Sequence, residues 1–354
     1  MAKAKRGGPI GVGVAGLGRA GWMGHCGELE PRGDRFAVVA ASEPMLADRR
    51  AEFEARFAGT EARAYGSYEA MLADARVELV SIASRTADHE AQAAAALKAG
   101  KHVVLEKPMA GDLKAAKRIA RVATKSAGQL LVRHNRRFET AMTAVRSLMK
   151  SKVLGKVHTI RLRRQSFQYR ADWQALKASS GGQLLNWGPH VIDHGLVLMG
   201  SPVASVWSDL RRLTARGDAE DHVQLLLTAE NGVVCDIEIS GAVASGEPEW
   251  AVHGDRGSLN CTGRTIRLRH LDPGCKPKLG RATTGDPGGY GWSKGLEWVE
   301  REFEAEASEY GVESDIWDAV YGAVRGRKKY PITVEHALEV MRVIDVAKKG
   351  TPFA

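Results

Sequence analysis

Cysteine is scarce in this chain of 354 residues, which holds only Cys26, Cys235, Cys261 and Cys275. These residues stand far apart and form no Cys-x-x-Cys pair, so the sequence indicates neither a zinc site nor a redox dithiol. We interpret all four as buried free thiols. No cluster of cysteine, histidine and carboxylate residues has the spacing of metal ligands, so we predict no metal. No apolar run reaches the roughly 18 residues that a membrane-spanning helix requires.

The first eight residues are basic and lack the long apolar region and small-residue cleavage site of a signal peptide. We interpret residues 1–8 as a disordered tail and expect a cytoplasmic protein. The net charge of +9 could suit an anionic substrate, a dinucleotide or nucleic acid. However, the short basic runs at 161–164 and 325–329 do not interleave with aromatic residues as a nucleic-acid platform does. We interpret them as solvated faces and expect no nucleic-acid partner.

The first third of the chain alternates short apolar segments with helical patterns. The apolar segments cover residues 9–16, 36–41, 78–84, 101–106 and 129–134, and the helical patterns cover 45–58, 86–101 and 111–128. Continuous apolar runs are typical of parallel strands that are covered on both faces. Their alternation with helices predicts right-handed βαβ units in an open, doubly wound sheet. We therefore predict a Rossmann dinucleotide-binding domain over residues 9–133.

The pattern changes after Phe138, where strands come to dominate. A helix at 139–153, an alternating strand at 156–167 and a helix near 184–199 precede strand patterns at 203–213, 222–229, 233–240, 249–254 and 265–271, and helical patterns at 315–326 and 333–350 end the chain. Asn231-Gly232 between two of the strands is a strong hairpin signal. We predict that residues 134–354 form an α+β substrate-binding domain on a large, mostly antiparallel open sheet. We expect the Gly- and Pro-rich stretch 271–295 to be a long loop, either mobile or a lid over a site.

A glycine fingerprint, Gly16-x-Gly18-x-x-Gly21, lies between an apolar segment and a helical one. In a dinucleotide site the first glycine makes the tight turn, the second lets the backbone approach the pyrophosphate, and the third lets helix and strand pack closely. Glu43 follows the next apolar segment, about twenty residues beyond the last glycine, as the fingerprint requires. Its carboxylate can bind a ribose hydroxyl and would repel a 2′-phosphate, so we predict NAD in preference to NADP. The alternative is a tight turn without a ligand.

Lys107 directly follows the strand pattern at 101–106 and precedes a proline. Ligands of doubly wound sheets bind beyond the carboxyl ends of the strands. We therefore place Lys107 at the mouth of the cofactor crevice. For a lysine considered alone, an ordinary surface position at a strand end would be the better interpretation. Here Glu106 and Pro108 hold the segment in a turn beside the dinucleotide site.

The stretch "LNWGPHVIDH" at 185–194 is unusual because no Lys, Arg or Glu falls between Leu184 and Gly200. A surface helix shows a broad charged face, so we predict a helix that is buried nearly all round. Asn186, His190 and Asp193 form its narrow polar stripe. Asn186 is either an N-cap before Pro189 or a substrate contact. His190 is either a satisfied core histidine or a catalytic base, and Asp193 either orients it or pairs with Arg137.

Four segments together resemble the Gfo/Idh/MocA family of sugar and polyol oxidoreductases, over about residues 9 to 350: the glycine fingerprint, residues 78–108, "HNRRF" at 134–138 and "GGQLLNWGPHVIDH" at 181–194. Glu-Lys-Pro after a "GKHV" strand is specific to that family in this context. The resemblance implies a Rossmann domain followed by an α+β domain on an open sheet whose exposed face commonly mediates oligomers. On that basis we expect a homo-oligomer, a dimer or a tetramer, formed through the C-terminal sheet.

The resemblance also implies roles for individual residues. Lys107 and His190 would be the catalytic pair, and Asp193, Asn186, Arg137 and Asn135 would bind substrate. Cofactor binding would fall on Gly16, Leu17, Gly18, Arg19, Gly21, Ser42, Glu43, Ser84, Thr86, His89, Glu106 and Lys107. The Lys107–Pro108 bond is expected to be cis. Asn186 departs from the family, which usually has Asp there, because Asn keeps the hydrogen bonds and loses the charge.

These residues predict reversible oxidation of a secondary alcohol on a sugar, a polyol or a derivative. His190 would take the hydroxyl proton as general base, and Lys107 would stabilise the developing alkoxide. One alternative keeps the same residues in an NAD-dependent glycoside hydrolase or lyase that oxidises the sugar transiently. Another is a dinucleotide-binding sensor without turnover, which the presence of both Lys107 and His190 disfavours.

Overall fold

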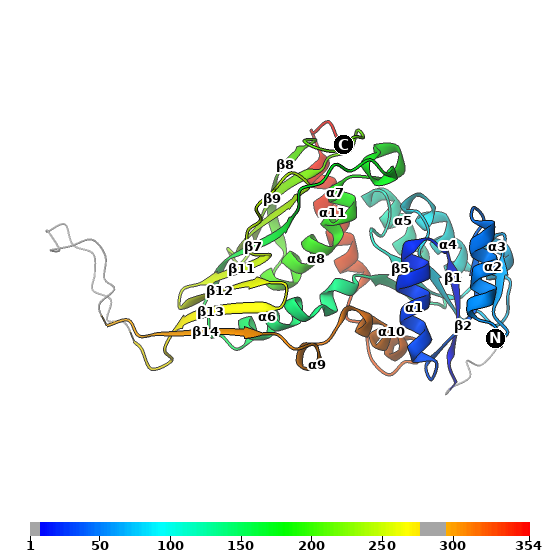
Figure 1. Ribbon diagram of the computed structural model, residues 1–354, viewed down its shortest axis with the longest axis horizontal. Helices are drawn as coiled ribbons and strands as arrows, with labels where there is room; N and C mark the ends of the chain where they lie inside the picture. The colour runs from blue at the N-terminus through cyan, green and yellow to red at the C-terminus, as the bar shows by residue number, and fades with distance from the viewer. Residues whose placement is uncertain (1–7, 277–294) are drawn as a thin grey trace.

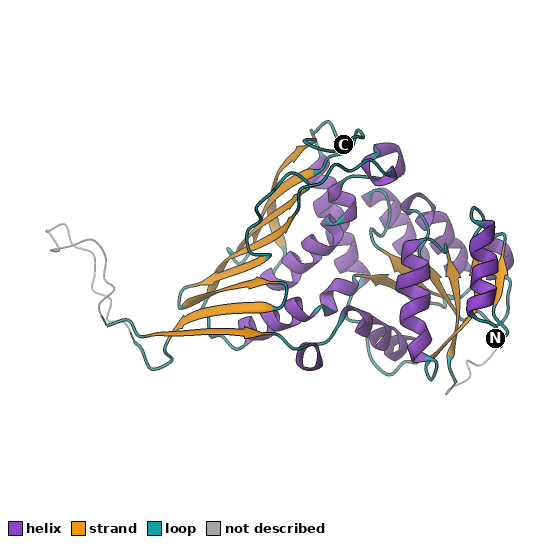
Figure 2. Ribbon diagram, viewed as in Figure 1, coloured by secondary structure: helices purple, strands orange, loops and turns teal. Residues whose placement is uncertain are grey.

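The computed structural model describes residues 8–276 and 295–354, in which two sheets are separated by helices (Figures 1 and 2). Residues 1–7 of the expected tail and 277–294 of the expected loop or lid at 271–295 lie outside these residues, and Leu271 belongs to a strand. Cys26, Cys235, Cys261 and Cys275 are buried free thiols, as predicted. Among the helices of the described residues, none has the length and apolarity to cross a bilayer.

The first sheet has six parallel strands in the order β3-β2-β1-β4-β5-β6. Its strands are β1 (Ile10–Ala15), β2 (Phe36–Ser42), β3 (Arg63–Tyr65), β4 (Leu79–Ile82), β5 (His102–Glu106) and β6 (Leu130–Arg133). Five of these strands were predicted, and the doubly wound fold class is confirmed. The order reverses beside β1, which creates a crevice at the carboxyl ends of β1 and β4, the place where such sheets bind ligands.

Helices cover both faces of this sheet (Figure 2). After β1 a π-helical segment, η1 (Ala20–Cys26), runs into α1 (Gly27–Leu29), and the other helices are α2 (Ala47–Arg56), α3 (Tyr68–Leu72), α4 (His89–Lys98) and α5 (Leu113–Ala123). Asp112 caps α5 by accepting a hydrogen bond from the Ala115 N–H group at 2.7 Å. The sequence pattern missed the short elements β3 and α3, which span three and five residues.

The second sheet has eight strands in the order β14-β13-β12-β11-β7-β10-β9-β8, and only β7 and β10 pair in parallel. Its strands are β7 (Val157–Gln165), β8 (Val203–Arg211), β9 (His222–Ala229), β10 (Val234–Ser240), β11 (Trp250–Gly254), β12 (Gly257–Thr262), β13 (Thr265–Leu271) and β14 (Trp298–Glu304). The helices are α6 (Thr140–Lys150), α7 (Gln183–Asn186), α8 (Gly188–Met199), α9 (Ala307–Tyr310), α10 (Ile316–Val324) and α11 (Val334–Lys348). The predicted mostly antiparallel α+β architecture is therefore confirmed.

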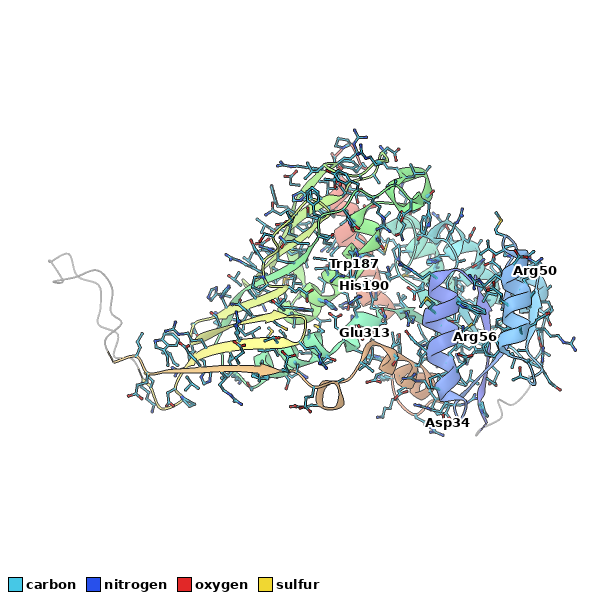
Figure 3. The ribbon with its side chains drawn as sticks, in the orientation of Figure 1. Asp34, Arg50, Arg56, Trp187, His190 and Glu313 are labelled. Atoms are coloured by element: carbon cyan, nitrogen blue, oxygen red, sulfur yellow. The ribbon has the colours of Figure 1, made fainter. Side chains whose placement is uncertain are left out.

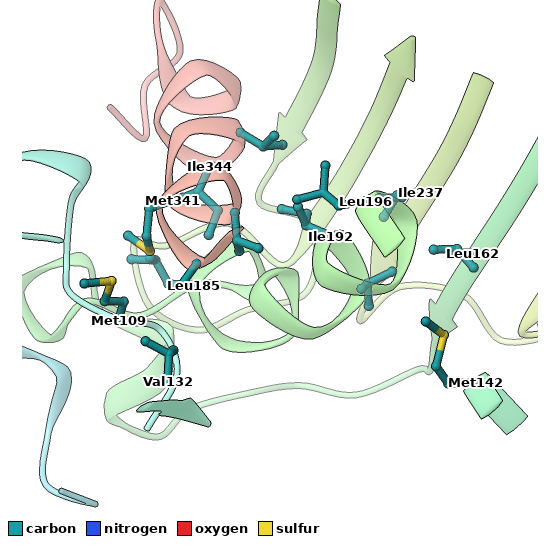
Figure 4. Packing of buried hydrophobic residues seen from close by; sticks show 14 of the residues in the cluster. Met109, Val132, Met142, Leu162, Leu185, Ile192, Leu196, Ile237, Met341 and Ile344 are labelled. Carbon is teal, nitrogen blue, oxygen red and sulfur yellow. The ribbon is translucent and has the colours of Figure 1, made fainter. Parts of the chain in front are cut away.

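Helix α8 forms the centre of one continuous hydrophobic core. Every residue of α8 except Val197 is buried, as its lack of charged residues predicted. Its side chains pack between the inner face of the second sheet and α11 (Figure 4). Met109 and Val132, from the first sheet and its loops, belong to the same cluster. The two sheets are thus joined by shared apolar packing, which fixes α8 relative to the carboxyl ends of β5 and β6.

Helix α10 falls within the range predicted for the second domain but packs against the first sheet. Trp317 is fully buried, lies edge-on to Phe36 at 5.7 Å, and donates an indole hydrogen bond to Glu28 at 2.7 Å. Ile316 and Val320 join the same cluster under β1 and β2. The chain therefore returns to the Rossmann domain at α10. A single boundary at residue 133 does not account for this return.

Candidate active site

The glycine fingerprint forms a tight turn between β1 and η1. Gly16 has a φ of +87°, and a Cβ atom there would lie 2.9 Å from the backbone of Ser84. A Cβ atom at Gly21 would lie 1.9 Å from the carbonyl oxygen of Gly16, whereas one at Gly18 would meet no atom within 4 Å. The first and third glycines are required by close packing, and the second leaves open space that a phosphate group can fill.

Glu43 supports this turn from the end of β2. Its buried carboxylate accepts hydrogen bonds from the backbone N–H groups of Leu17 at 2.8 Å, Met45 at 2.9 Å and Leu46 at 3.3 Å. The carbonyl group of Ser42 accepts the Gly16 N–H group at 2.8 Å. A carboxylate has about four acceptor positions, so Glu43 keeps capacity for one further donor, such as a ribose hydroxyl.

Ser84, Thr86 and His89 lie after β4, on the other side of the crevice. The hydroxyl group of Ser84 donates to Gln92 at 2.7 Å, and Thr86 begins a short 3₁₀ turn. His89 is buried and lies 2.9 Å from the carbonyl oxygen of Pro108 through Nδ1 and 3.4 Å from that of Ser84 through Nε2. Burial lowers the pKa of His89. His89 therefore bridges the segments that carry Ser84 and Lys107.

Glu106 and Lys107 end β5, and the peptide bond from Lys107 to Pro108 is cis, as predicted. The Glu106 carboxylate is held by Arg133 at 2.7 Å and by His25 at 3.0 Å. Although burial would raise the pKa of Glu106, Arg133 and His25 hold it well below its ordinary value. Glu106 is thus a buried anion directly beside Lys107, whose side chain is only half-buried.

The side chain of Lys107 crosses to the second domain. Its Nζ atom donates a hydrogen bond to the backbone carbonyl oxygen of Asn186, the last residue of α7, at 3.0 Å. Burial lowers the pKa of Lys107, and the charge of Glu106 opposes that shift. The ammonium group is therefore positioned by a neutral acceptor and is available to a second oxygen atom in the cavity.

His190 and Lys107 line the same cavity, a polar space of about 780 Å³ between the crevice and the second sheet. Figure 3 shows His190 and Trp187 near the middle of the molecule, between the first domain and the large sheet. Burial, together with the charges of Lys107 and Arg136, holds the pKa of His190 well below its ordinary value. Its Nδ1 atom has no hydrogen-bond partner among the described residues. Burial and these cations thus favour the neutral imidazole, whose Nδ1 atom is unused within the described residues.

Asn186 lines this cavity, and its interpretation as a helix cap is wrong. The chain breaks at Trp187, which occupies the N-cap position of α8, and no side chain caps that helix. The Asn186 amide lies 3.5 Å from Gln174, a weak contact across the cavity. The sequence placed the cap one residue early because α7 and α8 look like one helix in the pattern.

Asp193 pairs with Arg137, which confirms one of its two predicted alternatives, and it forms no hydrogen bond with His190 within the described residues. The Asp193 carboxylate is paired with the Arg137 guanidinium group and with Nε2 of His336 at 2.8 Å. Although burial opposes the shift, His134, Arg137 and His336 hold the pKa of Asp193 below its ordinary value. Neither Asp193 nor Arg137 lines the cavity with His190, and the same is true of Asn135 within the described residues. His336, in α11, carried no motif and was not predicted.

Several residues that sequence reasoning missed line the cavity, among them Arg136, Arg164, Arg170 and Trp187. The interpretation of residues 161–164 as a solvated face holds for the exposed Arg161 but not for the buried Arg163, and it missed that the exposed Arg164 lines the cavity, because alternation along β7 turns neighbouring arginines to opposite faces. Arg164 points into the cavity, and Arg163 is buried on the other face, where it pairs with Asp236 at 2.7 Å. The alternating pattern of β7 was the available signal.

Comparisons with known proteins identify both domains. Residues 10–134 match the family domain described as "Oxidoreductase family, NAD-binding Rossmann fold", and residues 142–260 match the "GFO/IDH/MocA C-terminal domain". The scyllo-inositol 2-dehydrogenase (NADP(+)) IolW of Bacillus subtilis is 25% identical over 97% of this chain and 94% of its own length.

Two further likenesses are informative. The 1-carboxy-3-chloro-3,4-dihydroxycyclo hexa-1,5-diene dehydrogenase of Comamonas testosteroni is 31% identical over 65% of this chain and 57% of its own length. The solved structure of an NAD-binding protein from Listeria innocua superposes with a TM-score of 0.78 at 24% identity and covers 97% of both chains. At that identity the structural likeness shows the fold alone.

Proposed function

The chain belongs to the Gfo/Idh/MocA family of oxidoreductases, and we propose that it is a dehydrogenase that transfers hydride between a nicotinamide dinucleotide and a secondary alcohol of a sugar, a polyol or a derivative. The observation that carries the proposal is that Lys107 and His190, from different domains, line one polar cavity that extends to Arg19 in the glycine fingerprint. A proton acceptor and a cationic donor thus share a space adjoining the dinucleotide crevice.

The residues around the crevice fit a dinucleotide. Gly18 offers the open space that a pyrophosphate needs, Arg19 is exposed beside it, and Glu43 retains one acceptor position for a ribose hydroxyl. We propose NAD as the cofactor because a 2′-phosphate would meet the Glu43 carboxylate. When bound, the cofactor supplies the hydride chemistry.

Within this site the protein's own residues would handle the proton. Burial and the neighbouring cations disfavour the protonated form of His190 in the free protein. His190 would accept the hydroxyl proton through an imidazole nitrogen. Lys107, held by the Asn186 carbonyl group, would donate a hydrogen bond to the same substrate oxygen and stabilise the developing negative charge. Asn186 would orient a neighbouring hydroxyl, and the Asp193–Arg137 pair would hold α8 in place from outside the cavity.

The substrate class is supported by the relatives. IolW is named for a polyhydroxylated ring, and the Comamonas enzyme for a ring with two hydroxyl groups. A cavity of about 780 Å³ with polar walls suits a molecule of that kind. We also propose self-association through the outer face of the second sheet, where Trp207 and Leu226 are exposed and paired in register. Light scattering on the purified protein would test that assembly.

The test is a screen of sugars, inositols and sugar acids with NAD and with NADP, monitored by absorbance of the reduced cofactor. We expect turnover with NAD and a loss of at least about a hundredfold in kcat for Lys107→Ala and for His190→Ala. Lys98→Ala, an exposed lysine at the end of α4, is the matched control. Turnover that survives both cavity substitutions would refute the proposed pair, and product formation without released NADH would indicate transient oxidation instead.

A further inference from the structure

We propose that the substrate of this site carries a negatively charged group, a carboxylate or a phosphate, and that Arg136 and Arg164 bind it beside His190. The inference rests on the proposed dehydrogenase function and adds a substrate class to it. It starts from the charge of the cavity wall. Arg19, Lys107, Arg136, Arg164 and Arg170 line the cavity, and Asp172 is the one carboxylate among the described lining residues.

The five cations do not have the same role. Arg19 lies in the glycine fingerprint, where the cofactor pyrophosphate is expected. Arg170 is already paired with Asp172, whose two oxygens lie 3.0 and 3.2 Å from its Nε atom. Lys107 is assigned to the reacting oxygen. Arg136 and Arg164 remain, and neither has a counter-charge inside the cavity.

Most N–H donors of these two arginines have no hydrogen-bond partner within the described residues. Arg164 donates no hydrogen bond within the described residues, and its nearest carboxylate, Glu249, lies 3.5 Å away. Arg136 uses Nη1 for Glu139 at 2.8 Å, while its Nε and Nη2 atoms have no partner in the described part of the chain. A guanidinium group presents five N–H donors in a planar fork that fits a carboxylate or a phosphate.

Both guanidinium groups are held in place by one aromatic ring. The central carbon of Arg164 lies 3.9 Å, and that of Arg136 4.6 Å, from the centroid of the Trp187 ring. Trp187 in turn lies 5.8 Å from the ring of His190. Stacking on tryptophan stabilises the arginines without using their in-plane donors. A pre-positioned pair of cations loses little side-chain entropy when an anion binds.

The counter-charges that make this arrangement stable lie behind the cavity. Glu139, Glu249 and Glu313 line a separate, neighbouring space of about 320 Å³, which Arg136, Arg164 and Trp187 also border. Arg136, Arg164 and His190 border both spaces, so the three glutamates partly neutralise the arginines from one space, whereas Asp172, already paired with Arg170, is the one carboxylate among the described residues that line the other. A neutral polyol would leave those donors without a charged partner, whereas an oxyanion would satisfy them.

The experiment compares matched substrates on the full-length protein with NAD. The sets are glucose, glucuronate and glucose 6-phosphate; galactose, galacturonate and galactose 6-phosphate; and myo-inositol with inositol 1-phosphate. We expect an anionic member to exceed its neutral counterpart in kcat/KM by about 10- to 100-fold, the effect of a charge-assisted hydrogen bond. Whether the uronate or the phosphate is preferred identifies the anion. Added salt should reduce the preference.

Arg164→Gln should abolish this preference, and Arg161→Gln should not. Arg161 is the matched control because it lies three residues earlier on β7, is exposed and does not line the cavity. Circular dichroism would confirm that both variants fold. A neutral sugar used as well as its anionic counterparts, or a preference that survives Arg164→Gln, would overturn the proposal and leave the dehydrogenase function standing.

A second measurement separates this inference from the proposed function. If no compound in the panel is oxidised, the proposed function fails for these substrates. Thermal denaturation in the presence of NAD then tests whether the cavity binds an anionic sugar in preference to a neutral one. Glucuronate or glucose 6-phosphate should then raise the melting temperature more than glucose, and Arg164→Gln should remove the difference. Equal shifts for glucose, or a shift that inorganic phosphate alone reproduces in full, would overturn the proposal.

Discussion

The side chain of Lys107 is bonded to the backbone of Asn186: the Lys107 Nζ atom donates a hydrogen bond to the Asn186 carbonyl oxygen at 3.0 Å. This bond joins the end of β5 in the first sheet to the junction of α7 and α8 in the second domain. Because the acceptor belongs to the backbone, the side chain at position 186 can vary without releasing the lysine. The Asn found here and the Asp that the resemblance implies at this position are both compatible with the tether.

We expect Asn186→Asp to move the acidic limb of the pH profile for kcat/KM to higher pH. The proposed base, His190, would work only when it is deprotonated, so activity should fall as the pH drops through its pKa. That pKa is held low by burial and by Lys107, Arg136 and His134, with Glu106 opposing. A new carboxylate in the cavity would favour the protonated form and raise the pKa by roughly one unit. Asn186→Ala keeps the backbone acceptor and adds no charge, so an equal shift in that variant would contradict the explanation.

Two glycines of the fingerprint should respond differently to alanine. We expect Gly18→Ala to fold normally and to bind NADH about tenfold more weakly or worse, because its Cβ atom enters open space that the pyrophosphate needs. We expect Gly21→Ala to lower the melting temperature even without cofactor, because its Cβ atom would lie 1.9 Å from the Gly16 carbonyl oxygen. NADH fluorescence titration and thermal denaturation separate the two effects. Equal melting temperatures for Gly21→Ala and the wild type would argue against the close packing at Gly21.

Acid should destabilise the protein partly through His134. This residue is buried without a hydrogen-bond partner on either ring nitrogen among the described residues, and burial lowers its pKa to about 4. The unfolded chain binds that proton near pH 6.5, so the contribution to stability is complete above pH 6.5 and falls as the pH drops towards 4. The full loss is about 3 kcal/mol.

Urea unfolding at about pH 7.5 and pH 5.5 would measure this effect, since the first value lies above the unfolded-state histidine pKa and the second lies below it. His134→Phe keeps a planar aromatic ring at the site and removes the titration, so it should lose less stability between the two pH values than the wild type. His158→Phe, an exposed position on β7, is the control and should behave like the wild type. An unchanged loss in His134→Phe would show that other groups dominate.

Removing Arg133 should destabilise the first domain more than a surface substitution does. Arg133 is buried and donates to Glu106 at 2.7 Å, and Glu106 has His25 as its other side-chain partner. Arg133→Met would leave the Glu106 carboxylate short of a counter-charge, at a cost of about 3–5 kcal/mol in the free energy of unfolding. Arg121→Met, at an exposed site at the end of α5, should cost less than about 0.5 kcal/mol. Comparable losses in both variants would contradict the role of the buried pair.

The local features of the fold could be predicted from the sequence. Apolar runs specified five of the six parallel strands, the Asn231-Gly232 turn specified the β9–β10 hairpin, and the absence of charge specified the burial of α8. The glycine fingerprint likewise placed a tight turn after β1. Each of these features depends on neighbours in the chain, whose spacing a sequence displays directly. Short elements such as β3 and α3 escaped because three to five residues carry little periodicity.

Only the tertiary structure decided which side chains share the cavity. The sequence left Asp193 as a partner of either His190 or Arg137, and only the structure shows that it pairs with Arg137 and with His336, from segments before and after α8. Arg164 looked like part of a solvated basic run, yet the pleat of β7 turns it into the cavity. Periodicity shows which side chains lie on the same face of a helix or strand, but it does not show which other elements pack against that face. The meeting of β5, α8 and β7 is set by long-range packing of the shared core, and it is there that the site gains its positive charge.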